Sequence, residues 1–349
     1  MPSGLQSSLA EAGHPLIELE GTDSSVLILP HGGRILSLAP DGRNLLWVHE
    51  DMSDPVKAAA RLGGDEWPNP GGDRIWMSPE AELCISDLSD AWATYVIPPV
   101  MDPGEHEATV EGDRVLLRNR ARLSLHQTHA EVDTEILRVI RAAPNPLRRE
   151  SDAADLLAQT SYAGYEQSSH LELLTSTDPR AAIDLWSLTM VPSGGDVLIP
   201  TTRRSEPLHF FGGRVGPGVQ STDDCITFTI NAREQDKIGV RAADLIGRIG
   251  YLRPLGDGTE SLIVRNFVVD PSGEYVDMPW EDVDDIGYCV QCYNDDGSMA
   301  DFGEMEYHSP GIGGDTGRTE YTDVSQMWAY VGPPDAVRGI ARWLLGVAV

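Results

Sequence analysis

The sequence predicts an all-β fold, a large antiparallel β-sandwich. Short segments rich in apolar and β-branched residues follow one another at close, regular spacing along the 349 residues, with Gly, Asn and Asp between them as turn signals. Helical periodicity is almost absent, and no repeat, low-complexity tract or linker divides the chain. We therefore expect a single β-sandwich domain over residues 1–349.

The first half of the chain is expected to alternate between short strands and turns. Strands are expected at residues 16–19, 26–30, 34–38, 44–48, 93–97, 107–111, 114–118, 122–126 and 135–140. Residues 63–80 are too rich in Gly and Pro for a regular element and are expected to form a loop. A short helix is expected at 150–160, because Ser151 or Asp152 can cap its first turn.

The second half continues the same pattern to the end of the chain. Strands are expected at residues 161–174, 183–188, 196–200, 226–230, 237–241, 248–252, 261–267 and 302–310. Residues 335–349 fit either an amphipathic helix or a final strand.

The charge balance excludes two classes of partner. There are 55 acidic and 26 basic residues, which gives a formal net charge of -29, and Lys57 and Lys237 are the two lysines. A field this negative repels nucleic acid phosphates and anionic membranes. An acidic, lysine-poor composition is typical of salt-adapted proteins, because high salt screens the self-repulsion, and we expect a halophilic source.

The sequence favours a cytoplasmic location. No apolar run approaches the length of a membrane span, and the first residues lack the basic and apolar regions of a secretion signal.

The cysteines indicate neither a disulfide framework nor a metal site. Cys289 and Cys292 lie three residues apart in a strand-like run, so their side chains are expected on opposite faces, where they cannot bind one zinc together. With Cys84 and Cys225 they are expected to be core thiols. No cofactor is expected.

The strand at 302–310 is the strongest candidate for chemistry. Alternation along a strand places Glu304, Glu306 and His308 on one face. Two carboxylates and an imidazole are costly to bury together unless they bond to each other, to a metal or to a ligand. Such a row can give protons to a bound substrate and take them back. The alternative is a solvated, inert strand face.

The loop at 63–80 has the composition of a sugar site. Trp67 and Trp76 offer flat apolar faces for stacking, and Asp73 and Arg74 can bond to hydroxyl groups. The alternative is a buttressing loop in which the two charged side chains bond to backbone.

Four short motifs resemble a known family. Residues 29–35 (LPHGGRI) and 41–47 (DGRNLLW) resemble the first hairpins of aldose 1-epimerase-like, or galactose mutarotase-like, proteins. Residues 72–80 (GDRIWMSPE) and 302–310 (FGEMEYHSP) resemble uncharacterised prokaryotic relatives of that superfamily. The resemblance implies a β-supersandwich with a sugar cleft on one concave sheet.

The resemblance also implies roles for individual residues. The late glutamate that acts as general base in mutarotases corresponds to Glu304, and Glu306 stands where these enzymes have a glutamine. The family's Asn-His-x-Tyr-Phe-Asn motif is not present. His170 matches the acid histidine by its place in the chain, and His308 is the second candidate for the acid.

The expected function is therefore general acid/base chemistry on a small-molecule carbohydrate by an aldose 1-epimerase-like isomerase. Arg74 and Asp73 would bind hydroxyls, with Trp76 or Trp67 stacked on the ring. A polysaccharide lyase or glycoside-processing enzyme is an alternative, with Arg34 or Arg74 neutralising a uronic acid. A carbohydrate-binding protein without catalysis is the other alternative.

Overall fold

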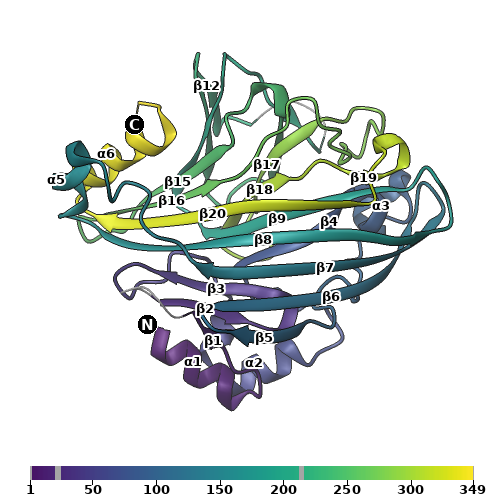
Figure 1. Cartoon of the computed structure of the whole chain (residues 1–349), viewed down its shortest axis with the longest axis horizontal. Helices are drawn as coiled ribbons and strands as arrows, with labels where there is room; N and C mark the ends of the chain where they lie inside the picture. The colour runs from purple at the N-terminus through teal and green to yellow at the C-terminus, as the bar shows by residue number, and fades with distance from the viewer. Residues whose placement is uncertain (1, 20–24, 212–215, 349) are drawn as a thin grey trace.

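The computed structural model describes residues 2–19, 25–211 and 216–348, and these residues form two ten-stranded antiparallel sheets (Figure 1). The predicted all-β sandwich is confirmed. In order across the first sheet, the strands are β1 (Ile17–Glu18), β2 (Ser25–Leu29), β3 (Arg34–Ala39), β4 (Asp73–Ser78), β9 (Ala182–Pro192), β18 (Phe302–His308), β17 (Tyr288–Asn294), β14 (Asp236–Arg241) and β11 (Leu208–His209), and β19 (Ile312–Gly313) pairs with β9.

The second sheet contains the longest strands of the protein. In order across it, the strands are β12 (Val219–Ser221), β13 (Cys225–Ile230), β10 (Gly195–Pro200), β15 (Arg248–Pro254), β16 (Glu260–Asn266), β20 (Glu320–Gly332), β8 (Ser161–Ser176), β7 (Ala130–Ala142), β6 (Arg114–Leu125) and β5 (Glu107–Glu111). Strands β20, β8, β7 and β6 run side by side across the middle of the molecule in Figure 1.

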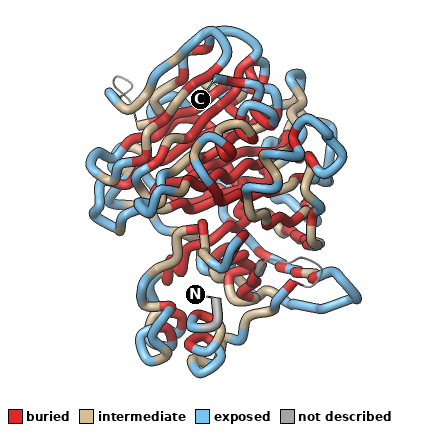
Figure 2. The backbone as a smooth tube through the Cα atoms, turned by 90° about the vertical axis from the view of Figure 1, so that its left-hand side faces the viewer, coloured by how far each residue is buried: buried red, intermediate tan, exposed pale blue. Residues whose placement is uncertain are grey.

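The main apolar core lies between the two sheets. Met305 and Tyr307 on β18 belong to one buried cluster with Tyr165 on β8 and Met327 on β20. Figure 2 shows buried residues along the strands and exposed residues mainly in the connections. Because successive side chains of a strand point to opposite faces, the residues that alternate with Met305 and Tyr307 face away from this core.

Helices are few and lie outside the two sheets. The α-helices are α1 (Pro2–Glu11), α2 (Pro55–Leu62), α3 (Glu80–Cys84), α4 (Ala91–Thr94), α5 (Ala154–Leu157) and α6 (Pro334–Leu345), and the 3-10 turns are η1 (His31–Gly33), η2 (Glu50–Ser53), η3 (Leu88–Asp90), η4 (Ser151–Ala153), η5 (Ala242–Asp244) and η6 (Gly314–Thr316). The predicted short helix near 150–160 corresponds to η4 and α5. Residues 335–349, for which a helix and a strand were both open, contain most of α6.

The helices α1 and α2 together, and α6 separately, cover apolar faces of strands. Leu5 and Leu9 of α1 and Leu62 of α2 pack with Leu29 and Leu36 of the first sheet. Figure 1 shows α1 and α2 together at the lower end of the molecule, and α6 at the opposite side near β15 and β16. The helix α6 buries its apolar face in a separate cluster that includes residues of β16 and β20.

Three sequence predictions of local structure were wrong. Within the expected loop at 63–80, residues Asp73–Ser78 form β4, because six consecutive pairings with β9 outweigh the Gly and Pro content. Residues 44–48 have one isolated bridge, between Val48 and Gly71, in place of a strand. Residues 93–97 begin within α4, and Tyr95 makes one isolated bridge to Ile85.

All four cysteines are free and buried. None of the helices in the described part of the chain is long and apolar enough to cross a membrane.

Candidate functional site

A cavity of about 1060 Å³ opens on the face of the first sheet that points away from the core. Five neighbouring strands, β4, β9, β18, β17 and β14, build its floor because their outward side chains lie in register. Trp76 pairs across the strands with Trp186, and Glu306 with Leu188. The outward residues of these strands that line the cavity are Arg74, Trp76, Trp186, Leu188, Glu304, Glu306, Tyr293 and Lys237.

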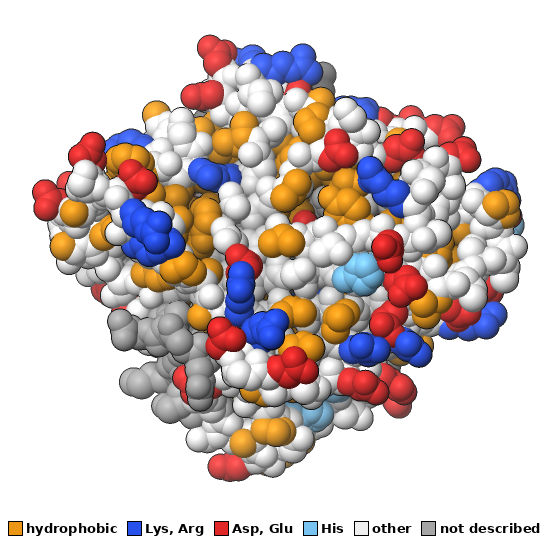
Figure 3. Space-filling view, in the orientation of Figure 1, with side chains coloured by type: hydrophobic (Ala, Val, Ile, Leu, Met, Phe, Trp, Pro, Cys, Tyr) orange, Lys and Arg blue, Asp and Glu red, His pale blue; other side chains and the backbone are white. Residues whose placement is uncertain are grey.

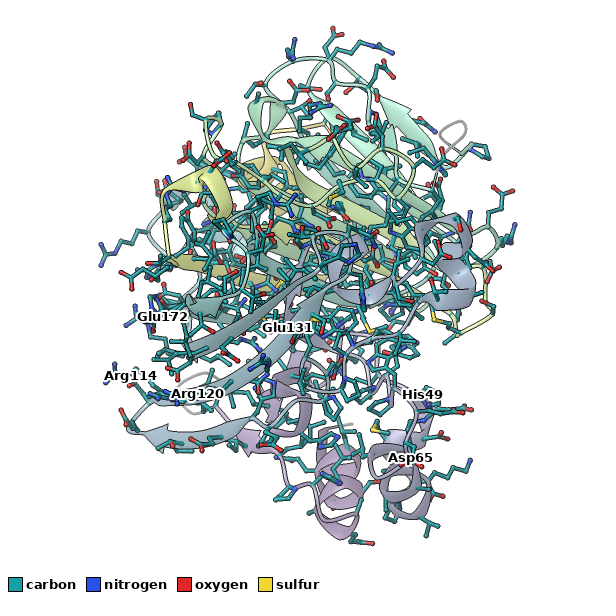
Figure 4. All side chains as sticks on the ribbon, turned by 90° about the vertical axis from the view of Figure 1, so that its right-hand side faces the viewer. His49, Asp65, Arg114, Arg120, Glu131 and Glu172 are labelled. Carbon is teal, nitrogen blue, oxygen red and sulfur yellow. The ribbon has the colours of Figure 1, made fainter. Side chains whose placement is uncertain are left out.

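Loops and helix ends form the walls of the cavity. Their aromatic members are Trp67, Trp92, Tyr95, Phe211 and Trp280. Asp65, which lies beside α2 in Figure 4, and Arg120 on β6 also line it. Segments far apart in the sequence therefore enclose one polar floor with aromatic walls, the common composition of a small-molecule site.

Glu304 is held by an arginine that packs against two adjoining tryptophans. Arg74 Nη1 donates a hydrogen bond to Glu304 Oε1 at 2.8 Å, and both side chains are almost fully buried. The Arg74 guanidinium carbon lies 4.1 Å from the ring centroid of Trp76 and 5.8 Å from that of Trp67. These contacts fix the guanidinium, and through it the carboxylate.

Glu306 is buried beside Glu304 in a different setting. Its Oε2 accepts a hydrogen bond from Trp186 Nε1 at 2.8 Å and lies 3.5 Å from Lys237 Nζ. Its Oε1 has no hydrogen-bond partner among the described residues. Burial raises the pKa of Glu306 to about 7, with help from Glu304 and Glu80 and against the lowering effect of Lys237.

Lys237 connects Glu306 to a second acidic residue. Its ammonium lies 3.0 Å from Glu80 Oε2 and 4.6 Å from the ring centroid of Trp186. Glu80 Oε1 accepts a hydrogen bond from the hydroxyl of Tyr95 at 2.9 Å. Burial alone would lower the pKa of Lys237, but Glu306, Glu80 and a further nearby carboxylate outweigh it and raise that pKa.

Asp102 organises the tryptophan wall. Its Oδ2 accepts hydrogen bonds from Trp67 Nε1 at 2.8 Å and from Trp76 Nε1 at 3.1 Å. The same oxygen forms an ion pair with the buried Arg34, which also donates to the carbonyl oxygen of Gly71 at 2.9 Å. Arg34, expected to bind substrate, does not line the cavity, because it is fully buried behind Asp102.

Acidic side chains outnumber basic ones around the cavity. The seven carboxylates are Asp65, Glu66, Glu80, Asp102, Glu105, Glu304 and Glu306, and the three cations are Arg74, Arg120 and Lys237. This excess disfavours an anionic ligand.

His308, expected on the reactive face, lies beneath the cavity floor. It shares the face of Glu304 and Glu306, as predicted, but its ring stacks on Trp186 at 5.6 Å between centroids and is fully buried. Its Nδ1 lies 3.2 Å from both Ser78 Oγ and Asp184 Oδ1. The expectation that His308 donates a proton to substrate is corrected here, because the imidazole does not line the cavity.

Two further predicted residues lie elsewhere. His170 is on β8 of the other sheet, where Nδ1 pairs with Thr322 Oγ1 at 2.9 Å, so the pairing of His170 with Glu304 is corrected too. Asp73 points into the core from the opposite face of β4 to Arg74, and its Oδ2 accepts from the Tyr165 hydroxyl at 2.7 Å. A fully buried Asp73 with partners inside the core is not placed to bind sugar hydroxyls.

The predicted residues that do meet at the cavity are Glu304, Glu306, Arg74, Trp76 and Trp67. Sequence reasoning missed Glu80, Lys237, Asp102 and Trp186. Lys237 had a detectable signal, since it is one of two lysines in an acidic chain and lies in an apolar strand pattern. Glu80 is the last residue of the motif at 72–80 but was given no role there, whereas Asp102 and Trp186 lie in segments without a distinctive motif.

The sequence left open whether Glu304, Glu306 and His308 bind a metal. In the part of the chain that the structure describes, no group of three or more His, Cys, Asp or Glu side chains is arranged to hold a metal ion.

Comparison with known proteins gives a family and several structures of low identity. The model of a family of unknown function, DUF6786, matches residues 6–349. No curated protein sequence matches the chain.

Among solved structures, the chain is similar to proteins named as aldose 1-epimerases, the class that its motifs resemble. A proposed aldose 1-epimerase from Klebsiella pneumoniae is 10% identical with a TM-score of 0.49, over 97% of this chain and 84% of that one. A proposed aldose 1-epimerase from Escherichia coli K12 is 12% identical with a TM-score of 0.42, and the match covers 91% of this chain and 99% of that one. Galactose 1-epimerase from Lactobacillus acidophilus is 8% identical with a TM-score of 0.43, and the match covers 91% of this chain and 98% of that one.

Proposed function

This chain belongs to DUF6786, a family of unknown function, and we propose that it is a carbohydrate-active isomerase of the aldose 1-epimerase kind. In this proposal Glu304 and Glu306 exchange protons with the anomeric centre of a sugar. The observation that carries it is the pair itself: two buried carboxyl groups on one strand face line one aromatic-walled cavity, and each has a different cationic neighbour.

The neighbours of the two carboxyl groups support a different role for each. Glu304 accepts a hydrogen bond from the Arg74 guanidinium, and in this proposal Glu304 is the base. Glu306, with a pKa of about 7, is protonated in a large share of molecules at neutral pH and is the acid. This assignment replaces the histidines that the resemblance implied, since neither lines the cavity.

The proposed reaction opens the sugar ring through two proton transfers, one to Glu304 and one from Glu306. Glu304 takes the proton of the sugar's O1 hydroxyl while Glu306 gives its proton to the ring oxygen, and the bond between C1 and the ring oxygen breaks. The open-chain aldehyde rotates about its C1–C2 bond. Return of both protons closes the ring on the other face of C1 and restores both carboxyl groups.

The tryptophans and cations would hold the sugar during this step. Trp76 and Trp67 line the cavity and contact the Arg74 guanidinium that bonds to Glu304. Lys237 and the Trp186 indole N–H both contact Glu306 Oε2. The excess of carboxylates around the cavity makes a neutral sugar the better ligand than a polyuronate. Elimination from a uronic acid polymer is therefore the weaker alternative.

The decisive experiment is NMR measurement of anomer exchange across a panel of common aldoses. We expect Glu304→Gln and Glu306→Gln each to slow the enzyme-dependent exchange by roughly 10²–10⁴-fold, the usual share of general acid–base catalysis. Glu111→Gln, at an exposed position on β5, is the matched control and should retain the wild-type rate.

Three results separate the alternatives. Binding of sugars without faster anomer exchange in the wild type would support a binding protein and contradict catalysis. Full activity in Glu304→Gln or Glu306→Gln would contradict the assigned pair. Turnover of a uronic acid polymer, detected by absorbance of the unsaturated product, would favour the lyase.

A further inference from the structure

The wall of the cavity contains an aromatic cluster that the acid–base step does not use. Trp92 from α4, Tyr95, Phe211 and Trp280 meet there from three separate segments of the chain. The ring centroids of Trp92 and Trp280 are 4.7 Å apart, those of Trp92 and Phe211 5.3 Å, and those of Phe211 and Trp280 5.1 Å. We call these four residues the outer aromatic cluster.

In the strand order, Phe211 of the outer aromatic cluster and the floor tryptophans lie on different sides of the carboxyl pair. Trp76 and Trp186 are on β4 and β9, on one side of β18 in the strand order. Phe211 follows β11 at the other edge of the sheet, and its ring packs 6.3 Å from that of Tyr293 on β17. In the strand order, Glu304 and Glu306 on β18 therefore lie between Phe211 and the floor tryptophans.

A chain of polar contacts joins the outer aromatic cluster to the acid. Tyr95 bonds to Glu80, Glu80 pairs with Lys237, and Lys237 pairs with Glu306. A ring placed on the cluster would therefore share the cavity with Glu306 and be linked to it through Glu80 and Lys237.

Two features of the outer aromatic cluster point to a ligand. Trp92 is 56% exposed although it packs against three other aromatic rings, so part of its apolar surface remains in contact with water. Trp280 is 9% exposed, and its buried Nε1 has no acceptor within the described residues. An indole N–H in an aromatic setting is usually satisfied by a hydrogen-bond acceptor, and a sugar hydroxyl supplies one.

The size of the cavity fits the same interpretation. At about 1060 Å³ it slightly exceeds the range of roughly 300–1,000 Å³ for small-molecule sites. One pyranose ring over Glu304 and Glu306 would leave the outer part of this space to solvent.

We propose that the outer aromatic cluster is a second sugar subsite, and that the ligand is a neutral disaccharide or longer glycoside. The reducing-end ring lies over Glu304 and Glu306, and the next ring stacks on Trp92 while a hydroxyl accepts from Trp280 Nε1. This inference rests on the proposed function, since it places the first ring at the proposed reactive pair.

Calorimetric titration of the full chain tests the proposal with defined probes. The probes are lactose, maltose, cellobiose and melibiose, with glucose and galactose as the single-ring references. We expect at least one disaccharide to bind the wild type ten or more times tighter than its component monosaccharides. Stacking of an added ring on an exposed tryptophan supplies that gain.

Three variants test which residues are responsible for the tighter binding of disaccharides. Trp92→Ala should reduce the ratio of disaccharide to monosaccharide affinity about tenfold. Trp280→Phe, which keeps an aromatic ring and removes the N–H donor, should reduce it a few-fold. Trp343→Ala removes another exposed tryptophan, 44% exposed on α6, and should leave both affinities at the wild-type values. Thermal unfolding of each variant confirms that it is folded.

The possible outcomes distinguish this inference from the proposed function. Equal binding of monosaccharides and disaccharides by the wild type, or equal loss of both in Trp92→Ala, overturns the second subsite and leaves the isomerase proposal standing if anomer exchange persists. Absence of binding and of anomer exchange with every sugar overturns both. The second subsite is supported if the ratio of disaccharide to monosaccharide affinity falls in Trp92→Ala and keeps its wild-type value in Trp343→Ala.

Discussion

Glu304 and Glu306 are two residues apart on one strand face, yet their surroundings differ. A guanidinium bonds to Glu304 at 2.8 Å, whereas an indole N–H and a more distant ammonium contact Glu306. Burial raises the pKa of Glu306 to about 7 and leaves its Oε1 free of partners among the residues described. A buried carboxyl group with a raised pKa can act as a general acid near neutral pH.

The pH dependence of turnover reports on Glu306. The acid must carry its proton, so we expect kcat/KM for anomer exchange to fall as pH rises through about 7. The negative charge of Glu80 raises the pKa of Glu306, so Glu80→Gln should lower that pKa and move the fall in activity to lower pH. Gln keeps an acceptor for the Tyr95 hydroxyl.

This expectation is checked by measuring kcat/KM for anomer exchange from pH 5 to 9. The proteins compared are the wild type, Glu80→Gln and the control Glu111→Gln. If kcat/KM of Glu80→Gln fell at the same pH as in the wild type, or at a higher pH, another group would control the pH dependence.

At the scale of the element, β18 both carries the site and anchors the sheet. His308, at its end, contacts Ser78 of β4 and Asp184 of β9, so one imidazole connects three strands below the cavity floor. Burial lowers the pKa of His308, but Asp184 outweighs burial and raises that pKa above its ordinary value of 6.5. Asp277 adds to this effect from the other side of the ring, 3.8 Å from Nε2.

A raised histidine pKa gives a defined dependence of stability on pH. The stabilisation from His308 is fully present below the unfolded-state pKa of about 6.5 and is lost as pH rises through the higher folded-state pKa. We expect His308→Gln to lower the free energy of unfolding by about 3 kcal/mol at pH 6, the usual cost of removing one partner of a buried ion pair. The deficit should shrink towards pH 9.

Urea denaturation of wild type and His308→Gln at pH 6 and pH 9 measures both effects. A deficit that is equal at the two pH values would show that the folded imidazole is uncharged throughout. His170→Gln, on the other sheet, is the matched control for loss of a histidine.

At the scale of the whole molecule, the net charge of -29 is the strongest long-range term. Figure 3 shows acidic side chains spread over this face of the molecule with basic side chains among them. Figure 4 shows Arg114, Arg120, Glu131 and Glu172 along the strands of the second sheet, so part of the charge is balanced locally. The remaining acidic excess repels itself in the compact state.

Salt should therefore stabilise the folded chain. The Debye length falls from about 10 Å at 0.1 M to about 3 Å at 1 M ionic strength, so repulsion between surface carboxylates is largely removed. We expect Tm to rise by several degrees between 0.1 M and 1 M KCl, as measured by calorimetry. Sucrose at matched osmolality is the control for effects of excluded solute, and an equal rise in sucrose would contradict the electrostatic explanation.

The fold class and part of the site follow from local patterns. Period-two alternation places Glu304, Glu306 and His308 on one face of a strand, because a pleated backbone allows no other arrangement. The Trp and Arg content of residues 63–80 pointed to Arg74, Trp67 and the neighbouring Trp76, which do line the cavity. The same content hid the strand β4, since pairing with β9 is not encoded within the segment itself.

By itself, the sequence determined the all-β class, the acidic surface and the shared face of the residues on β18. The tertiary structure decided which of these residues meet the cavity: Glu304 and Glu306 line it, while Trp186 covers His308. It also brought Lys237 to Glu306, because β14 and β18 lie on either side of β17. Alternation is a property of a single strand, whereas burial and charge pairing depend on which strands and loops become neighbours.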